Sequence, residues 1–126
     1  MAQSAGLHED GGLLSAATKD RHRAIVSLQE ELEAVDWYDQ RVEAADDPDL
    51  KLILAHNRDE EKEHAVMTLE WLRRSDPILD AHLRTYLFTT EPVTEVEVEA
   101  EAGGGEAAGG RSDGSLGIGS LKGVGR

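Results

Sequence analysis

The sequence DDPD, residues 46–49, decides the fold because it separates two long segments that both have helical character. Residues 14–44 contain neither Pro nor Gly, and their apolar side chains recur at the spacing of a helix. After the break, Asp47 is suited to cap a helix that has Pro48 in its first position and runs to about Ser75. A connection this short forces the two helices to lie antiparallel.

The sequence SDPILDAHLRTYLF, residues 75–88, repeats this arrangement and predicts a short third helix. Asp76 is its expected cap, and Pro77 takes its first helical position. We therefore assign residues 14–88 to one helical domain, preceded by a flexible leader at residues 1–13.

The composition changes after Phe88. Residues 89–114 are rich in Glu, Gly and Ala, and we expect a disordered acidic linker there, because like charges repel and little apolar surface can be buried. A short edge strand at the alternating Val and Glu residues is the alternative. Residues 115–126 form the terminal segment, which is suited to extended binding in apolar pockets; a merely disordered end is the other interpretation. Its large apolar residues include Leu116, Ile118 and Leu121.

The net charge and the absence of cysteine limit the partners and the metal ligands that this chain can use. The chain has 126 residues and a formal net charge of −13, so we expect neither nucleic acid nor an anionic membrane as a partner. Without cysteine, any metal must be held by Glu, Asp and His. The sequence shows no signal peptide and no apolar run of ~18 residues, and we expect a cytoplasmic protein.

Two long helices cannot cover their own apolar faces, because each has only one partner. We therefore predict an all-α chain of two long antiparallel helices and a short C-terminal helix, which dimerises into a four-helix bundle.

The second helix carries a pattern typical of metal ligands in RDEEKEHAVMTLEWLRR, residues 58–74. Counting turns along the helix places Glu61 and His64 on the inner face, whereas Glu60 lies just outside it and Glu63 well outside. A Glu-x-x-His pair on an inner helix face is the ligand set of di-iron and di-manganese carboxylate proteins. The predicted inner face consists of Leu50, Ile53, Leu54, Asn57, Glu61, His64, Ala65, Thr68, Trp71 and Leu72.

The first helix supplies one more candidate ligand. Glu31 lies near the edge of its predicted inner stripe, and Tyr38 follows two turns later as a core residue or as a group that orients a ligand. No second Glu-x-x-His occurs in the chain, so a complete di-metal site requires two copies related by a two-fold axis. The apolar residues of this stripe are Ala17, Ala24, Leu28, Leu32, Val35 and Val42.

Several alternatives stay open at this stage. A single Glu-x-x-His also arises by chance, which leaves a non-catalytic protein that only binds divalent cations. Oxygen-rich ligands with one imidazole suit iron(II) or manganese(II), so a di-manganese enzyme is a further alternative. On the opposite face of the first helix, Glu30, Glu33 and Trp37 form either a solvated surface or a second subunit contact that collects cations.

The chain closely resembles the encapsulated ferritins, half-size ferritin-like proteins carried inside encapsulin nanocompartments. The resemblance covers residues 21–88 almost continuously and then the tail. The matching motifs are RHRAIVSLQEELEAVDWYDQR, ILAHNRDEEKEHAVMTLEWLRR, LRTYLF and DGSLGIGSLKG.

The resemblance implies a ferroxidase that oxidises Fe(II) with dioxygen at a di-iron site between two subunits, with five such dimers in an annular decamer. It further implies that ferric iron is stored as mineral in the encapsulin shell, to which residues 115–122 attach the protein. Gln29, beside the ligands, departs from the apolar residue expected there. The implied ligands are Glu31, Glu61 and His64, with Tyr38 near the iron. The implied acidic site through which cations enter is Glu30, Glu33 and Trp37, and calcium or another divalent cation is its expected ligand.

Overall fold

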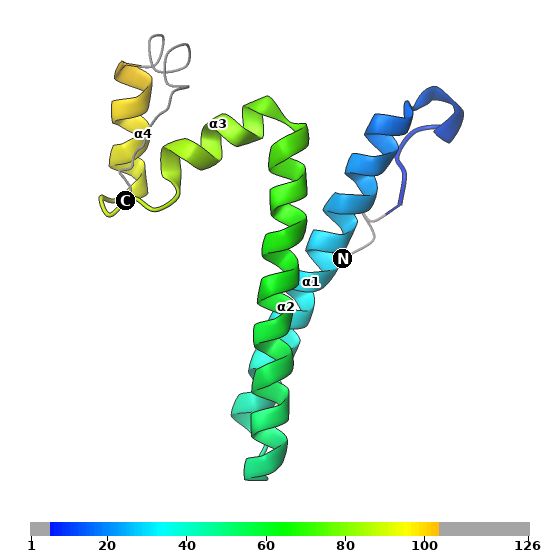
Figure 1. Cartoon of the computed structure of the whole chain (residues 1–126), viewed down its shortest axis with the longest axis vertical. Coiled ribbons are helices and arrows are strands. Elements are labelled where there is room, and N and C mark those ends of the chain that lie inside the picture. The colour runs from blue at the N-terminus through cyan, green and yellow to red at the C-terminus, as the bar shows by residue number, and fades with distance from the viewer. Residues whose placement is uncertain (1–5, 104–126) are drawn as a thin grey trace. The chain divides into compact units, whose positions relative to one another are not determined.

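The computed structural model describes residues 6–103, and this part of the chain is helical without any β-strand. Figure 1 shows the elements in chain order. The all-α prediction is confirmed. The elements are the 3-10 turn η2 (Gly11–Leu13) and the helices α1 (Ala16–Ala44), α2 (Pro48–Ser75), α3 (Pro77–Tyr86) and α4 (Val93–Ala102).

The ends of the two long helices are fixed by the residues around the break. The side chain of Asp47 accepts a hydrogen bond of 2.9 Å from the backbone N–H of Leu50, as predicted for a cap before Pro48. Lys51 then reaches back, and its ammonium group donates to the carbonyl oxygens of Val42 at 2.6 Å and Ala45 at 2.9 Å. These carbonyls lie at the C-terminal end of α1, where a helix lacks internal donors. Asp47 and Lys51 therefore stabilise the connection between α1 and α2, Asp47 at the start of α2 and Lys51 at the end of α1.

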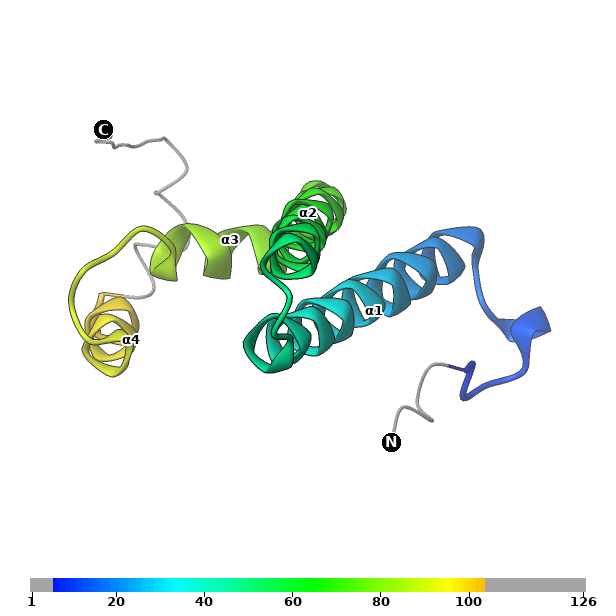
Figure 2. The ribbon, with the colours of Figure 1, turned by 90° about the horizontal axis from the view of Figure 1, so that it is seen from below.

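Helices α1 and α2 run antiparallel and lie side by side near their connection (Figures 1 and 2). On each helix, one line of half-buried or buried residues recurs at alternating spacings of four and three residues. This spacing is typical of two helices that pack against each other along their length. We call these two lines together the α1–α2 seam. On α1 it contains Ala24, Leu28, Glu31, Val35, Tyr38 and Val42, and on α2 Leu54, Arg58, Glu61, Ala65, Thr68 and Leu72.

The seam corrects the predicted inner faces. Glu31 lies in the seam and not at its edge, whereas Leu32 is 54% exposed. On α2, Ile53 and Trp71 were also predicted to be inside, yet they are 58% and 45% exposed. Apolar residues lie both in the seam and on the exposed surface beside it. Helical spacing alone therefore does not tell which apolar residues contact the partner helix. Only Ala65 and Leu72, each 6% exposed, form a buried apolar core among the described residues, although the chain carries many large apolar side chains.

The chain divides into two compact units between Asp76 and Pro77. This division groups α3 with α4, whereas the sequence prediction placed the third helix with the two long ones. Two residues after α3 ends at Tyr86, Phe88 has a positive φ of 62° and is almost completely exposed. The pKa of Tyr86 on α3 is raised by burial and by the carboxylates of Glu97 and Glu101.

Helix α4 was not predicted: residues 93–102 form neither a disordered linker nor a strand. The alternation of Val and Glu conceals a helical spacing, because Val96 and Ala100, four residues apart, are the half-buried ones. Glu and Ala are also good helix formers. No helix in residues 6–103 is long and apolar enough to cross a lipid bilayer.

Candidate metal centre

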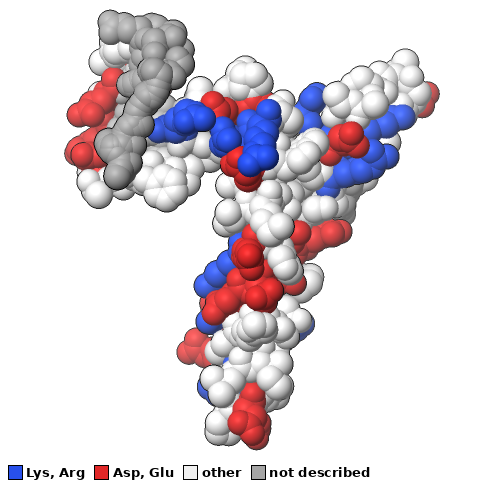
Figure 3. Space-filling view, viewed as in Figure 1, with Lys and Arg blue, Asp and Glu red and all other residues white. Residues whose placement is uncertain are grey.

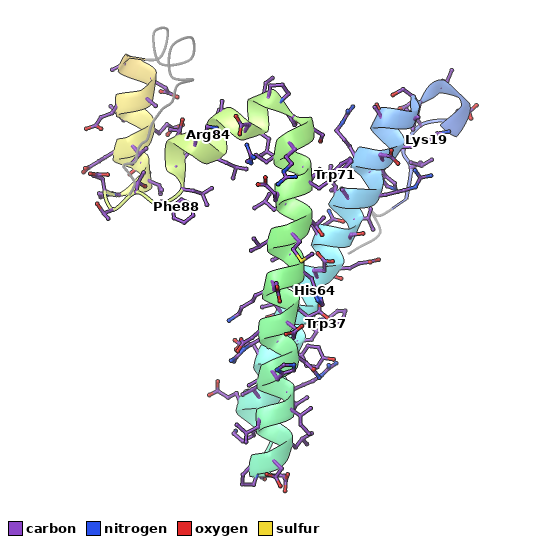
Figure 4. The ribbon with its side chains drawn as sticks, viewed as in Figure 1. Lys19, Trp37, His64, Trp71, Arg84 and Phe88 are labelled. Atoms are coloured by element: carbon purple, nitrogen blue, oxygen red, sulfur yellow. The ribbon has the colours of Figure 1, made fainter. Side chains whose placement is uncertain are left out.

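The Glu-x-x-His pair of α2 brings its two side chains close together. The Nδ1 atom of His64 lies 3.5 Å from Oε1 of Glu61, so the two groups can approach one cation. Both lie midway along α2, where His64 is labelled in Figure 4. The side chain of Glu61 is 27% exposed and that of His64 is 47% exposed. The pair therefore faces partly into the helix pair and partly outward.

Glu31 reaches the same region from α1. Its Oε1 atom accepts a hydrogen bond of 3.0 Å from the hydroxyl group of Thr68. The same hydroxyl oxygen lies 3.1 Å from the backbone carbonyl oxygen of His64. One side chain thus contacts both the Glu31 carboxylate and the helical turn of His64. The structure brings Glu31 to the turn of α2 that follows the Glu61–His64 pair.

Two residues near these ligands were missed or set aside by the sequence analysis. Thr68 was placed on the inner face without a role. Glu60 was placed just outside that face, yet its two carboxylate oxygens each lie 3.9 Å from an Nε2 atom, one of His56 and one of His64. These separations are too long for hydrogen bonds. The sequence signal for this arrangement is the four-residue spacing of His56, Glu60 and His64, which places the three side chains on neighbouring turns of one helix face.

Tyr38 lies in the seam and contacts a cation of its own helix. The guanidinium carbon of Arg41 is 5.1 Å from the centre of the Tyr38 ring. The ring is half-buried on the same line as Glu31, two turns further along α1.

The outward residues of α1 stay separate from this region. Glu30 and Glu33 are exposed and make no hydrogen bond or ion pair within residues 6–103, and Trp37 is 50% exposed. Gln29 is exposed as well. Leu116, Ile118 and Leu121, which are expected to bind the encapsulin shell, lie outside the described residues.

Beside Glu31, a groove of about 430 Å³ opens between the N-terminal half of α1 and the C-terminal half of α2. Glu31 and Thr68 lie in its wall, next to the exposed side chains of Met67 and Trp71. Trp71 is labelled in Figure 4, nearer the C-terminal end of α2 than His64. The groove gives the Glu31 carboxylate access to solvent.

The donor chemistry suits a hard cation, but one chain does not complete a site. Carboxylate oxygens and one imidazole fit Fe(II) or Mn(II). Acidic side chains gather midway along α1 and α2 on the face shown in Figure 3, which attracts cations to this region. Within residues 6–103, however, no three His, Asp or Glu residues converge closely enough to hold a metal ion.

The sequence of this chain is similar to those of known proteins. The EncFtn-like family model matches residues 6–90. The chain belongs to the EncFtn-like family. An encapsulated ferritin-like protein of Rhodospirillum rubrum is 64% identical over 98% of this chain and 93% of its own length. A ferritin-like protein of Thermotoga maritima is 54% identical, over 82% of this chain and 90% of its own.

Two further comparisons extend this result. An encapsulin nanocompartment cargo protein of Myxococcus xanthus is 35% identical over 60% of this chain and 61% of its own length. The crystal structure of a Nitrosomonas europaea protein matches with a TM-score of 0.68 and 62% identity, and covers 70% of this chain and 97% of that one. The family membership confirms the resemblance to encapsulated ferritins.

Proposed function

We propose that this protein is a ferroxidase whose di-iron site forms between two copies of the chain. Membership in the EncFtn-like family supports iron as the substrate. The observation that carries the proposal is the hydrogen bond from Thr68 to Glu31, which ties a carboxylate of α1 to the turn beside the Glu61–His64 pair. Glu31, Glu61 and His64 are half of the four carboxylates and two imidazoles of a di-iron carboxylate site.

In this proposal the second copy supplies the same three residues across a two-fold axis. The four carboxylates would neutralise the charge of two Fe(II) ions, and the His64 imidazole of each chain would supply a nitrogen ligand. The two Fe(II) ions would together give two electrons to one dioxygen molecule, which would take up two protons and be reduced to hydrogen peroxide, while both irons become Fe(III). In this proposal Tyr38, which lies on the seam two turns from Glu31, orients a ligand or its water.

The exposed residues Glu30 and Glu33, with Trp37 beside them, form the proposed outer site at which divalent cations arrive before oxidation. Their exposure and their lack of partners within residues 6–103 leave both carboxylates available to ions in solution. We further propose that five dimers form an annular decamer, as the family resemblance implies.

The test is the rate of Fe(II) oxidation after aerobic addition of ferrous iron, followed by ferric absorbance and by an oxygen electrode. Glu31→Ala and His64→Ala each remove a ligand from both halves of the site, and each should slow the reaction by at least about 100-fold, since losing even the hydrogen-bond partner of a ligand costs about 10–100-fold. Glu43→Ala, an exposed carboxylate near the end of α1, is the matched control and should keep the wild-type rate. Equal rates for all four proteins contradict the proposal. Iron binding without dioxygen consumption would instead identify a non-catalytic cation-binding protein.

We propose that the terminal segment, residues 115–126, attaches the protein to the inner wall of an encapsulin shell. The similarity to encapsulin cargo proteins supports this partner. Leu116, Ile118 and Leu121 would fill apolar pockets of the shell. Deletion of residues 115–126 should leave Fe(II) oxidation intact and abolish co-purification with a co-expressed shell protein. Retained co-purification would show that another segment carries the attachment.

A further inference from the structure

We propose that Thr68 is a positioning residue that holds the Glu31 carboxylate in place for cation binding, and this inference rests on the function proposed above. The hydroxyl oxygen of Thr68 lies 3.0 Å from Oε1 of Glu31. It is a side-chain hydrogen bond between α1 and α2 that ends on a candidate ligand. Thr68 therefore links α1, which carries Glu31, to α2, which carries Glu61 and His64.

The hydroxyl group of Thr68 has two acceptors within reach and only one proton to donate. A threonine within a helix usually donates to the carbonyl oxygen four residues earlier, here that of His64 at 3.1 Å. A carboxylate oxygen is the stronger acceptor, because its charge shortens and strengthens the hydrogen bond. Donation to Glu31 is therefore favoured, and the β-branched side chain restricts the directions in which the hydroxyl can point.

This hydrogen bond distinguishes the two oxygens of Glu31. Oε1 is held by Thr68, whereas Oε2 has no hydrogen-bond partner among residues 6–103. Oε2 is thus the atom left to bind a cation. Fixing Oε1 removes rotational freedom that the carboxylate would otherwise lose when the metal binds.

The groove beside Glu31 shows why such a restraint is needed. Glu31 and Thr68 both line this space of about 430 Å³. Without the hydrogen bond, the carboxylate has room to rotate into the groove, towards Ser27 on its own helix. The hydroxyl of Thr68 keeps it against α2, on the turn of His64.

The experiment compares full-length wild-type protein with Thr68→Val and Thr68→Ser. Valine keeps the shape and removes the hydroxyl, whereas serine keeps the hydroxyl. Thr85→Val is the matched control, because the Thr85 hydroxyl makes the same backbone hydrogen bond, to Ala81 at 3.0 Å, without a carboxylate. Mn(II) affinity is measured by titration calorimetry, and KM and kcat are measured for Fe(II) oxidation.

We expect Thr68→Val to bind Mn(II) about tenfold more weakly and to raise the KM for Fe(II) about tenfold, which is the usual effect of removing the partner of a metal ligand. Thr68→Ser should restore most of the affinity, and Thr85→Val should match wild type. A purely structural role would lower the Tm of Thr68→Val without changing Mn(II) affinity. That result would overturn the proposal, as would a serine variant that binds as weakly as the valine variant.

Thr68→Ala replaces the valine variant if the latter does not fold, because alanine has the highest helix propensity. The experiment distinguishes failure of the proposed ferroxidase function from failure of the proposed role of Thr68. A wild type that binds Mn(II) but does not oxidise Fe(II) contradicts the ferroxidase function, while the Mn(II) titration still decides the role of Thr68. A wild type that does not bind Mn(II) overturns the role of Thr68 in cation binding.

Discussion

Glu31 occupies a position in the α1–α2 seam that an apolar side chain would fill in an ordinary helix pair. Its neighbours one turn before and after along this line are Leu28 and Val35. A carboxylate among them costs stability, because it is partly removed from water and has one hydrogen bond, from Thr68, to compensate. Residues that a fold would not choose for stability are often those that function requires.

This trade-off predicts the behaviour of Glu31→Leu in metal-free protein. The leucine fills the seam, so the free energy of unfolding should rise by about 1–2 kcal/mol while Fe(II) oxidation is lost. Urea denaturation and the oxidation assay measure the two effects. Glu33→Leu, at an exposed position of the same helix, should not stabilise the protein. A destabilised Glu31→Leu would mean that the carboxylate supports the metal-free fold.

Glu70 shows the opposite case, a carboxylate whose role is structural. Hydrogen bonds from Arg73 and then Arg74, each 2.7 Å from Glu70, lower the pKa of its carboxyl group from 4.5 to about 2. Because the pKa is lower in the folded state, the ionised form stabilises the fold above pH 4.5, and this contribution is lost as the pH falls towards about 2. Glu70 is exposed enough for solvent to weaken the effect.

Glu70→Gln should therefore lower the Tm at neutral pH, and the difference from wild type should narrow as the pH falls from 4.5 towards about 2. Thermal unfolding followed by circular dichroism across this range measures it. Glu63→Gln, an exposed glutamate on the same helix, is the control. A Tm difference that stays constant with pH would show that Glu70 does not act through its charge.

At the scale of the element, the capped break at residues 46–49 determines how α1 and α2 are paired. Asp47 starts α2, and Lys51 in its first turns satisfies carbonyl oxygens at the end of α1. The ammonium group also complements the partial negative charge at a helix C-terminus. One lysine thus stabilises the end of one helix from the start of the next.

Lys51→Met should cost about 1–2 kcal/mol in the free energy of unfolding, since two hydrogen bonds to a charged donor are lost and the apolar stem is kept. Denaturant unfolding measures the change. Lys62→Met is the matched control, because Lys62 makes only a solvent-exposed ion pair, 3.5 Å from Asp59. Equal losses for the two variants would contradict the proposed role of Lys51.

The helices and caps could be predicted from the sequence because they depend on local signals such as Asp47 before Pro48. The Glu61–His64 pair could be predicted for the same reason, since three-residue spacing on one helix fixes the distance. Contacts between helices were harder: neither the hydrogen bond from Thr68 to Glu31 nor the exposure of Leu32 follows from spacing alone. Helix α4 was missed because a six-residue alternation fits two periodicities.

At the scale of the whole molecule, the first unit, which ends at Asp76, leaves much apolar surface uncovered for one chain. Ile53, Met67 and Trp71 of α2 are all at least 45% exposed, and Met67 and Trp71 border the groove beside Glu31. Exposed apolar surface next to an incomplete ligand set has one simple explanation, which is a second copy that covers the surface and completes the site. Dimerisation and the shared di-iron site thus belong to the same prediction.

The most direct test is native mass spectrometry of the protein loaded anaerobically with Fe(II). We predict dimers, or assemblies of dimers, that carry two irons per pair of chains, and monomers that carry none. His64→Ala should lose the bound iron while its fold, measured by circular dichroism, is kept. Monomers that bind iron as fully as dimers would contradict the central claim that two chains are needed to build the site.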